Sequence, residues 1–203
     1  MKFDHVFPIP ISTFVVDEAI VKNTTALVKK FIKDTNFDQP YESGELLTTF
    51  YKDKDFLGNL GDKPLLNYIN NASRQYLNLL GYDPMCFVEI TSWLQFNQPG
   101  SYFVRHDHYG ALISGVLYLE VPEKSGDILF HNPLEARRVT NTFFERIKKD
   151  ETAYNFGHVK YTPVVGEMLI FESWLPHTVR QNKSDSNRIS VSFNIWADID
   201  VKN

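Results

Sequence analysis

The stretch YFVRHDHYGALISGVLYL, residues 102–119, decides how this chain is interpreted. Its first part has the pattern of a strand. Side chains alternate between the faces of a strand, so His106 and His108 share one face while Arg105 and Asp107 share the other. Residues two apart on a strand are about 7 Å apart at the backbone, and from there two imidazoles can reach one metal ion. The alternative is a polar strand end with two solvated histidines, and the spacing alone leaves both interpretations open.

A third histidine lies far along the chain, in SWLPHTVRQNKSDSNRISVSFNIW at residues 173–196. His177 would complete a set of three ligands on one side of a metal and leave other positions open for substrate. Arg188 follows eleven positions later and begins a strand with one polar and one apolar face. The polar face consists of Arg188, Ser190, Ser192 and Asn194. An arginine at its rim suits a carboxylate, held by two parallel hydrogen bonds, although a surface salt bridge is the commoner role of an isolated arginine.

This order of residues resembles the Fe(II)/2-oxoglutarate-dependent oxygenases, in which a histidine and a second ligand are followed, after a long gap, by a histidine and a basic residue. Four segments are similar, in order, to the prolyl-hydroxylase-like branch, and especially to a group of small bacterial and phage oxygenases. They are SGVLYL (114–119), SGDILFHNP (125–133), VVGEMLIFESWLPHTV (164–179) and NRISVSFN (187–194). The resemblance begins at FPIP (7–10) and implies a mainly β fold, a double-stranded β-helix of the jelly-roll or cupin type with N-terminal helices packed outside.

The resemblance also implies a site and a reaction. Fe(II) would be held by His106, His108 and His177, and 2-oxoglutarate would bind to the iron. The candidate residues for binding the co-substrate are Arg188, Tyr118, Ser190, Leu129 and Val179. The implied enzyme is a dioxygenase that couples decarboxylation of 2-oxoglutarate to succinate with hydroxylation by O2. Its substrate would be a small molecule or a peptidyl group.

One position departs from the family pattern, because most such oxygenases have Asp or Glu as the second ligand and this chain has His108. A strand would direct Asp107 away from His106 unless a bulge shifts the register, so Asp107 and Asp127 are fallback ligands. Three-histidine iron sites occur in cupin-type dioxygenases that use no 2-oxoglutarate. That class is therefore an alternative, and so is a catalytically silent barrel that uses its metal structurally.

Composition limits the class of protein further. With 203 residues, 43% of them hydrophobic, the chain is expected to form one domain with a sizeable core. A formal charge of −4 argues against general nucleic-acid binding. The sequence has no long apolar run and no signal-peptide pattern, so no membrane partner is expected. The single cysteine, Cys86, permits no internal disulfide, which favours the cytoplasm of a bacterium or of the host cell of a phage.

The pattern of the chain divides it into two regions. Residues 1–85 are expected to be a helical support region, with helices at 17–33 and 64–80. Residues 86–203 are expected to form the barrel core, with strands at 87–97, 102–108, 112–121, 127–130, 158–162, 167–171, 178–182 and 188–197. The insertion at 132–157 is interpreted as a lid over the site or as an ordinary amphipathic helix. Tyr102 and Trp174 flank the metal-bearing segments, where they could shape a substrate entrance, and an exposed barrel edge would allow a homodimer.

Overall fold

The computed structural model describes residues 8–35, 47–134, 146–152 and 155–197, without the side chains of residues 86–88. The helices of this part are α1 (Glu18–Thr35), α2 (Phe56–Leu60), α3 (Lys63–Leu79) and the short 3-10 helix η1 (Pro84–Cys86). The strands are β1 (Ile11–Val15), β2 (Leu47–Thr48), β3 (Phe87–Asn97), β4 (Phe103–His106), β5 (Ile113–Glu120), β6 (Ile128–His131), β7 (His158–Tyr161), β8 (Glu167–Glu172), β9 (His177–Val179) and β10 (Arg188–Ala197).

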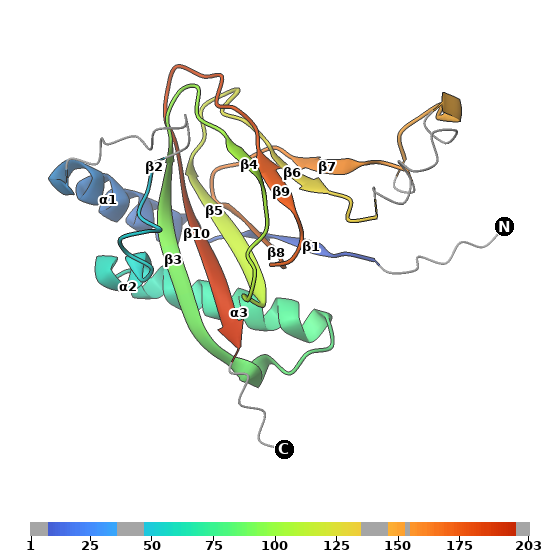
Figure 1. The fold of residues 1–203 in the computed structure, drawn as a ribbon. Helices are drawn as coiled ribbons and strands as arrows, with labels where there is room; N and C mark the ends of the chain where they lie inside the picture. Colours follow the sequence, from blue (N-terminus) through green and yellow to red (C-terminus); the bar gives the residue numbers. More distant parts are fainter. Residues whose placement is uncertain (1–7, 36–46, 135–145, 153–154, 198–203) are drawn as a thin grey trace.

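The strands form two antiparallel sheets (Figure 1). The large sheet has six strands in the order β1-β8-β5-β10-β3-β2, and the small sheet has four in the order β4-β9-β6-β7. A cluster of buried side chains from β5, β6 and β8, including Val116, Phe130 and Phe171, packs between the sheets. The non-consecutive strand order brings β4 and β9 side by side, although they are some 70 residues apart in the chain. Strand pairing therefore brings together two of the candidate ligands, His106 and His177.

The helices cover the outer face of the large sheet (Figure 1). Leu65 and Ile69 of α3 and Val28 of α1 belong to the same buried cluster as Phe193 and Leu94 of the sheet. Burial of these apolar side chains stabilises the fold and fixes the sheet as a rigid platform. The expected mainly β fold with helices packed outside is confirmed. None of the helices in the described residues is both long and apolar enough to cross a membrane.

Strand β10 runs through the middle of the large sheet and separates its two faces. Ile189, Val191, Phe193 and Ile195 lie in the cluster under the helices. The intervening residues Arg188, Ser190, Ser192 and Asn194 are also buried, but they point to the inner face. Because the side-chain period of a strand is two, the sequence pattern alone fixed which residues would face the interior of the barrel.

Most predicted elements are present with small shifts in their bounds. The predicted strand 102–108 ends at His106, because the chain turns away from the sheet after β4. Strand β1, the two-residue strand β2 and helix α2 were not predicted, since they are short and lack a clear period. The helix expected in the insertion falls mainly on 135–145, outside the described residues.

Candidate active site

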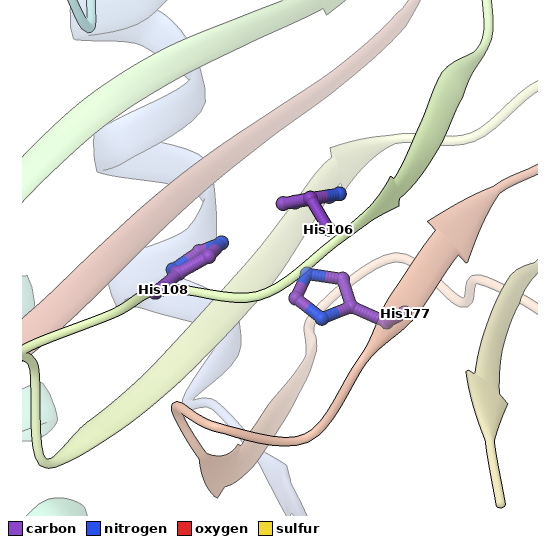
Figure 2. Close-up of side chains that lie close together, drawn as sticks. All are labelled: His106, His108 and His177. Carbon is purple, nitrogen blue, oxygen red and sulfur yellow. The ribbon is translucent and has the colours of Figure 1, made fainter. Parts of the chain in front are cut away.

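Three histidines come together at the ends of β4 and β9. His106 is the last residue of β4, His177 is the first of β9, and the two are direct partners in the pairing of these strands. His108 lies two residues beyond β4, where its backbone N–H donates to the carbonyl of Ser173 at 2.9 Å. Figure 2 shows the three rings turned toward one another. One ligand atom from each histidine lies within 4.8 Å of those of the other two, close enough to hold one metal ion.

The hydrogen bonds of the imidazoles decide which nitrogen is available. The Nδ1 of His106 donates to the Val104 carbonyl at 2.8 Å, and the Nδ1 of His177 donates to the Leu175 carbonyl at 3.0 Å. The Nδ1 of His108 also faces an oxygen, that of a side-chain amide. A carbonyl oxygen only accepts, so Nδ1 carries the proton, and in a neutral imidazole Nε2 then keeps its lone pair. All three histidines therefore offer Nε2 to a metal.

A polar network holds the ring of His108. Its Nδ1 donates to Asn194 Oδ1 at 2.6 Å, and the Ser114 hydroxyl lies 3.0 Å from the same nitrogen. Ser114 Oγ donates to Asn194 Oδ1 at 2.7 Å and lies 2.7 Å from Ser173 Oγ. Oxygen partners on the second nitrogen of a metal-binding imidazole fix the tautomer and ring orientation. Sequence reasoning did not assign this role to Ser114 and Asn194. The available signal was that Asn194 lies on the polar face of β10.

Burial keeps the three imidazoles neutral. The pKa of His106 is lowered from 6.5 to about 4, chiefly by desolvation and also by the nearby His108, although its hydrogen bond to the Val104 carbonyl opposes this. Desolvation also lowers the pKa of His108, although its bond to Asn194 opposes this. The pKa of His177, the most deeply buried of the three, lies well below 6.5. A metal ligand must be unprotonated, and three neutral imidazole nitrogens form a donor set that suits Fe(II).

The two fallback carboxylates lie outside this cluster. Asp107 is exposed and lines a larger cavity, but its carboxylate does not belong to the ligand cluster. Asp127 precedes β6 and accepts a hydrogen bond from Thr162 Oγ1 at 2.9 Å, and its other oxygen lies 4.0 Å from Arg180 Nη1. Within the described residues, the metal-ligand cluster consists of the three histidines without a carboxylate.

Arg188 is buried inside the barrel. Only 2% of its surface is exposed, and its Nη1 donates to the carbonyl oxygens of Ser125 and Gly126 at 3.1 and 2.7 Å. Gly126 has φ +92°, and a Cβ there would lie 2.2 Å from the Arg180 carbonyl oxygen, so the turn that receives Arg188 requires glycine.

At this end of the barrel, two buried polar atoms have no hydrogen-bond partner. They are Nε of Arg188 itself and Oγ of Ser190. The ring of Tyr118 lies 5.9 Å from the guanidinium carbon, and burial raises the pKa of its phenol to about 12. Burial also lowers the pKa of Arg188, although the guanidinium remains charged at neutral pH. An unpartnered buried donor is costly, so this end of the barrel is suited to an anion that accepts from Arg188.

A small cavity of about 30 Å³ joins these two ends. The candidates Tyr118, Ser190, Arg188 and Val179 line it together with the three histidines. Leu129 does not line it, and Ile128 does. Ile128 is the partner of Val179 in the β6–β9 pair, so alternation along β6 turns Leu129 to the opposite face.

A second cavity, of about 610 Å³, adjoins the three-histidine cluster, because His106 and His108 also line it. It shares four lining residues with the small cavity, namely Gln95, Phe103, His106 and His108. Tyr102 and Trp174, which the sequence suggested for a substrate entrance, are partly exposed but line neither cavity. The three-histidine cluster thus lies where a small cavity between the sheets meets a larger one.

A protein family described as "Putative 2OG-Fe(II) oxygenase" matches residues 91–194, just over half of the chain. This span contains the three histidines and Arg188. The chain belongs to this family. It is an Fe(II)/2-oxoglutarate-dependent oxygenase, as the sequence resemblance predicted, and it uses iron, 2-oxoglutarate and O2. The two alternatives, a cupin-type dioxygenase independent of 2-oxoglutarate and a silent barrel, are not favoured.

Solved structures of other oxygenases share the fold. A prolyl-4-hydroxylase from Pseudomonas putida is 15% identical, with 94% of each chain covered and a TM-score of 0.61. The epimerase SnoN, in complex with Fe3+, alpha-ketoglutarate and nogalamycin RO, is 12% identical over 93% of this chain and 79% of its own, with a TM-score of 0.65. The carbocyclase SnoK from nogalamycin biosynthesis is 14% identical over 92% and 79%, with a TM-score of 0.62.

These likenesses confirm that the oxygenase has the double-stranded β-helix fold. At such low identity they carry no information on its substrate. No curated protein sequence matches the chain significantly.

Proposed function

We propose that this oxygenase binds Fe(II) through Nε2 of His106, His108 and His177. The observation that carries the proposal is the small cavity, which has the three histidines at one end and the buried guanidinium of Arg188 at the other. Two distant parts of the chain thus form the two halves of one site. The shared tautomer of the imidazoles supports their role as ligands, because their Nδ1 atoms are all occupied.

The far carboxylate of 2-oxoglutarate would bind at the Arg188 end. The Nε of Arg188 and the Ser190 hydroxyl, which lack partners, can both donate to it, and the Tyr118 phenol stays protonated as a further donor. The small cavity has room for about two waters. The keto-acid end of the co-substrate therefore extends to the metal centre, where the small and large cavities share residues.

The net reaction is R–H + 2-oxoglutarate + O2 → R–OH + succinate + CO2. The iron and 2-oxoglutarate supply the oxidising chemistry, and the protein supplies binding, orientation and exclusion of water. Three imidazoles are neutral ligands, so they leave the double positive charge of Fe(II) uncompensated. The dianionic co-substrate would compensate it. This charge balance would make His108 compatible with the reaction at a position where most such oxygenases carry a carboxylate.

The large cavity, which reaches His106 and His108, would hold the substrate. The helices and both sheets are proposed to act as one domain, with 1–85 as support for the barrel of 86–203. This is supported by the buried cluster that α1, α2 and α3 share with the large sheet. The cytoplasmic setting and the homodimer expected from the sequence stay predictions.

An anaerobic titration tests the proposed site. Metal-free protein is titrated with Fe(II) and then with 2-oxoglutarate, and the visible charge-transfer absorption of the chelated iron is recorded. Arg188→Ala should keep its Fe(II) affinity and lose 2-oxoglutarate affinity by about 10-fold or more, since a charge-assisted hydrogen bond contributes about 1.5–3 kcal/mol. Arg180→Ala, which removes a more exposed guanidinium, is the matched control and should bind as wild type does.

The same titration tests whether His108 or its neighbour Asp107 is the metal ligand. His108→Ala should weaken Fe(II) binding strongly, and Asp107→Ala should leave it within about twofold of wild type. If Asp107→Ala proves to be the variant that loses iron, the carboxylate is the ligand and the proposed three-histidine set is wrong. If iron binds but 2-oxoglutarate gives no absorption band, the proposed co-substrate site is wrong.

A further inference from the structure

The large cavity has the size of a small-molecule site. Its volume of about 610 Å³ lies within the range of about 300–1,000 Å³ found for pockets that bury such ligands. It reaches the metal centre, because His106 and His108 belong to its lining. A molecule bound there would present one edge to the iron.

Aromatic side chains converge on this cavity from four separate parts of the chain. Two follow β2, one comes from β3, two come from β4 and the turn after it, and one comes from β10. They are Phe50, Tyr51, Trp93, Phe103, Tyr109 and Trp196. Since these parts are far apart in the sequence, no single strand pattern accounts for their gathering.

The deeper rings are held in fixed positions. Phe50 and Trp93 meet edge to face with ring centroids 5.0 Å apart, and Trp93 lies 5.8 Å from the ring of His108. Trp196 Nε1 donates to Thr91 Oγ1 at 3.0 Å. A row of aromatic surface therefore runs from the cavity wall to the metal centre. Rigid aromatic walls favour flat rings, which can stack or meet them edge to face.

The aromatic rings at the outer rim of the cavity are not part of the hydrophobic core. Tyr109 is 97% exposed and Tyr51 is 65% exposed, yet both lie on the cavity. Large apolar side chains gathered at an exposed rim mark binding surfaces. Because Tyr109 lines the cavity and is almost wholly exposed, its ring lies at the outer rim of the cavity.

The charges on the lining limit what the ligand can carry. Glu89 and Asp107 contribute two carboxylates, and Lys54 contributes one ammonium group, which lies 5.6 Å from the centre of the Phe50 ring. The carboxylates outnumber the cation, so a phosphate or another multiply charged anion would be repelled. The net charge of −4 acts in the same direction.

We propose that the substrate of this oxygenase is a small molecule built on a flat aromatic ring system without a phosphate group, bound between the aromatic walls of the large cavity. This inference deepens the proposed function and rests on it. In this proposal Phe50, Trp93 and Trp196 contact the aromatic ring of the substrate, and Tyr109 covers the mouth of the cavity.

Calorimetric titration of the anaerobic enzyme, loaded with Fe(II) and 2-oxoglutarate, tests the inference. The probe is 2-naphthol, compared with its saturated counterpart decahydro-2-naphthol and with 2-naphthyl phosphate. The flat neutral ring should bind at least about tenfold more tightly than either comparison compound. Tyr109→Ser should weaken 2-naphthol binding about threefold to tenfold. Tyr82→Ser, which removes an exposed tyrosine outside the cavity, should leave it unchanged.

Three results would overturn the inference. One is equal binding of the flat and saturated compounds, the second is equal loss in Tyr109→Ser and Tyr82→Ser, and the third is binding of a proline-rich peptide with no binding of 2-naphthol. The charge-transfer absorption is recorded on the same sample before each titration. Absorption without 2-naphthol binding rejects the ring inference and leaves the proposed function standing, whereas loss of the absorption rejects the proposed function.

Discussion

The two cavities that meet at the metal centre differ in size and in the way they are built. The small one, about 30 Å³, lies between the sheets and ends at a guanidinium that is 2% exposed. The large one, about 610 Å³, has a wall formed by β3 and the end of β10, and it is bordered on its outer side by the turns after β2 and β4, where Tyr51 and Tyr109 reach solvent. A cavity inside the sheets cannot change without disturbing the core, whereas one bordered by turns can. The proposed co-substrate end is therefore the constrained one, and the proposed substrate end is where specificity can vary.

The largest expected effect comes from removing one of the three proposed metal ligands. His177→Ala should lower Fe(II) affinity by about 100-fold or more, since the site then keeps two imidazoles and loses its facial geometry. Fe(II) titration of metal-free protein measures this. Asp107→Ala is the control, and circular dichroism confirms that both variants fold. Wild-type iron affinity in His177→Ala would show that the metal binds elsewhere.

Acidification should destabilise the metal-free protein. The pKa of His106 is about 4 in the folded chain and 6.5 in the unfolded one. Between these values the unfolded chain binds a proton that the native state does not, so stability is complete above pH 6.5 and is lost as the pH falls toward 4.

Thermal melts from pH 7.5 to 4 measure the effect, with a lower melting temperature expected at each step below 6.5. His106→Gln, which cannot titrate, should show a shallower decline. An identical decline in both proteins would mean that other groups cause the pH dependence.

A third prediction concerns the rigidity of β5, whose Val116 and Tyr118 line the small cavity and whose Gly115 is paired with Phe193 in the core under the helices. A Cβ on Gly115 of β5 would lie 2.2 Å from Phe193 Cζ and 2.7 Å from the Leu169 carbonyl oxygen. Gly115→Ala should therefore lower the free energy of unfolding by about 1–3 kcal/mol, as overpacking does. Urea denaturation measures it. Tyr109→Ser, at the open cavity, should change stability by no more than about 0.5 kcal/mol. Equal losses would contradict the contrast between the cavities.

The smallest effect is expected from changing the hydrogen-bond network that holds the ring of His108. Asn194→Ala removes the acceptor that fixes the Nδ1 tautomer, so Fe(II) affinity should fall about tenfold. Asn194→Asp restores an acceptor and should recover most of it. A merely structural role would instead lower the melting temperature equally in both variants and leave iron affinity unchanged.

The sequence predicted the residues whose roles follow from local pattern. Alternation along a strand identified the polar face that Arg188 begins, and strand β3 was predicted at its observed bounds. The spacing of the histidines suggested His106, His108 and His177 as ligands of one metal, and the family resemblance implied the iron, the co-substrate and the fold. Prediction from the sequence was weaker for two other candidates, because Leu129 lines neither cavity and the fallback ligand Asp127 lies outside the histidine cluster. Whether a buried residue faces one cavity or the other depends on the partner strand, and a carboxylate near a strand end can be engaged elsewhere.

By itself, then, the sequence determined the family, the strand faces and the candidate ligands, because these depend on residue type and on a period of two. Only the tertiary structure decided which residues hold the ligands and what surrounds them. The bond from His108 to Asn194 joins positions 86 residues apart, and the aromatic cavity gathers Phe50, Trp93 and Trp196 from three regions. Such contacts arise from the order in which strands pair, which no local pattern encodes.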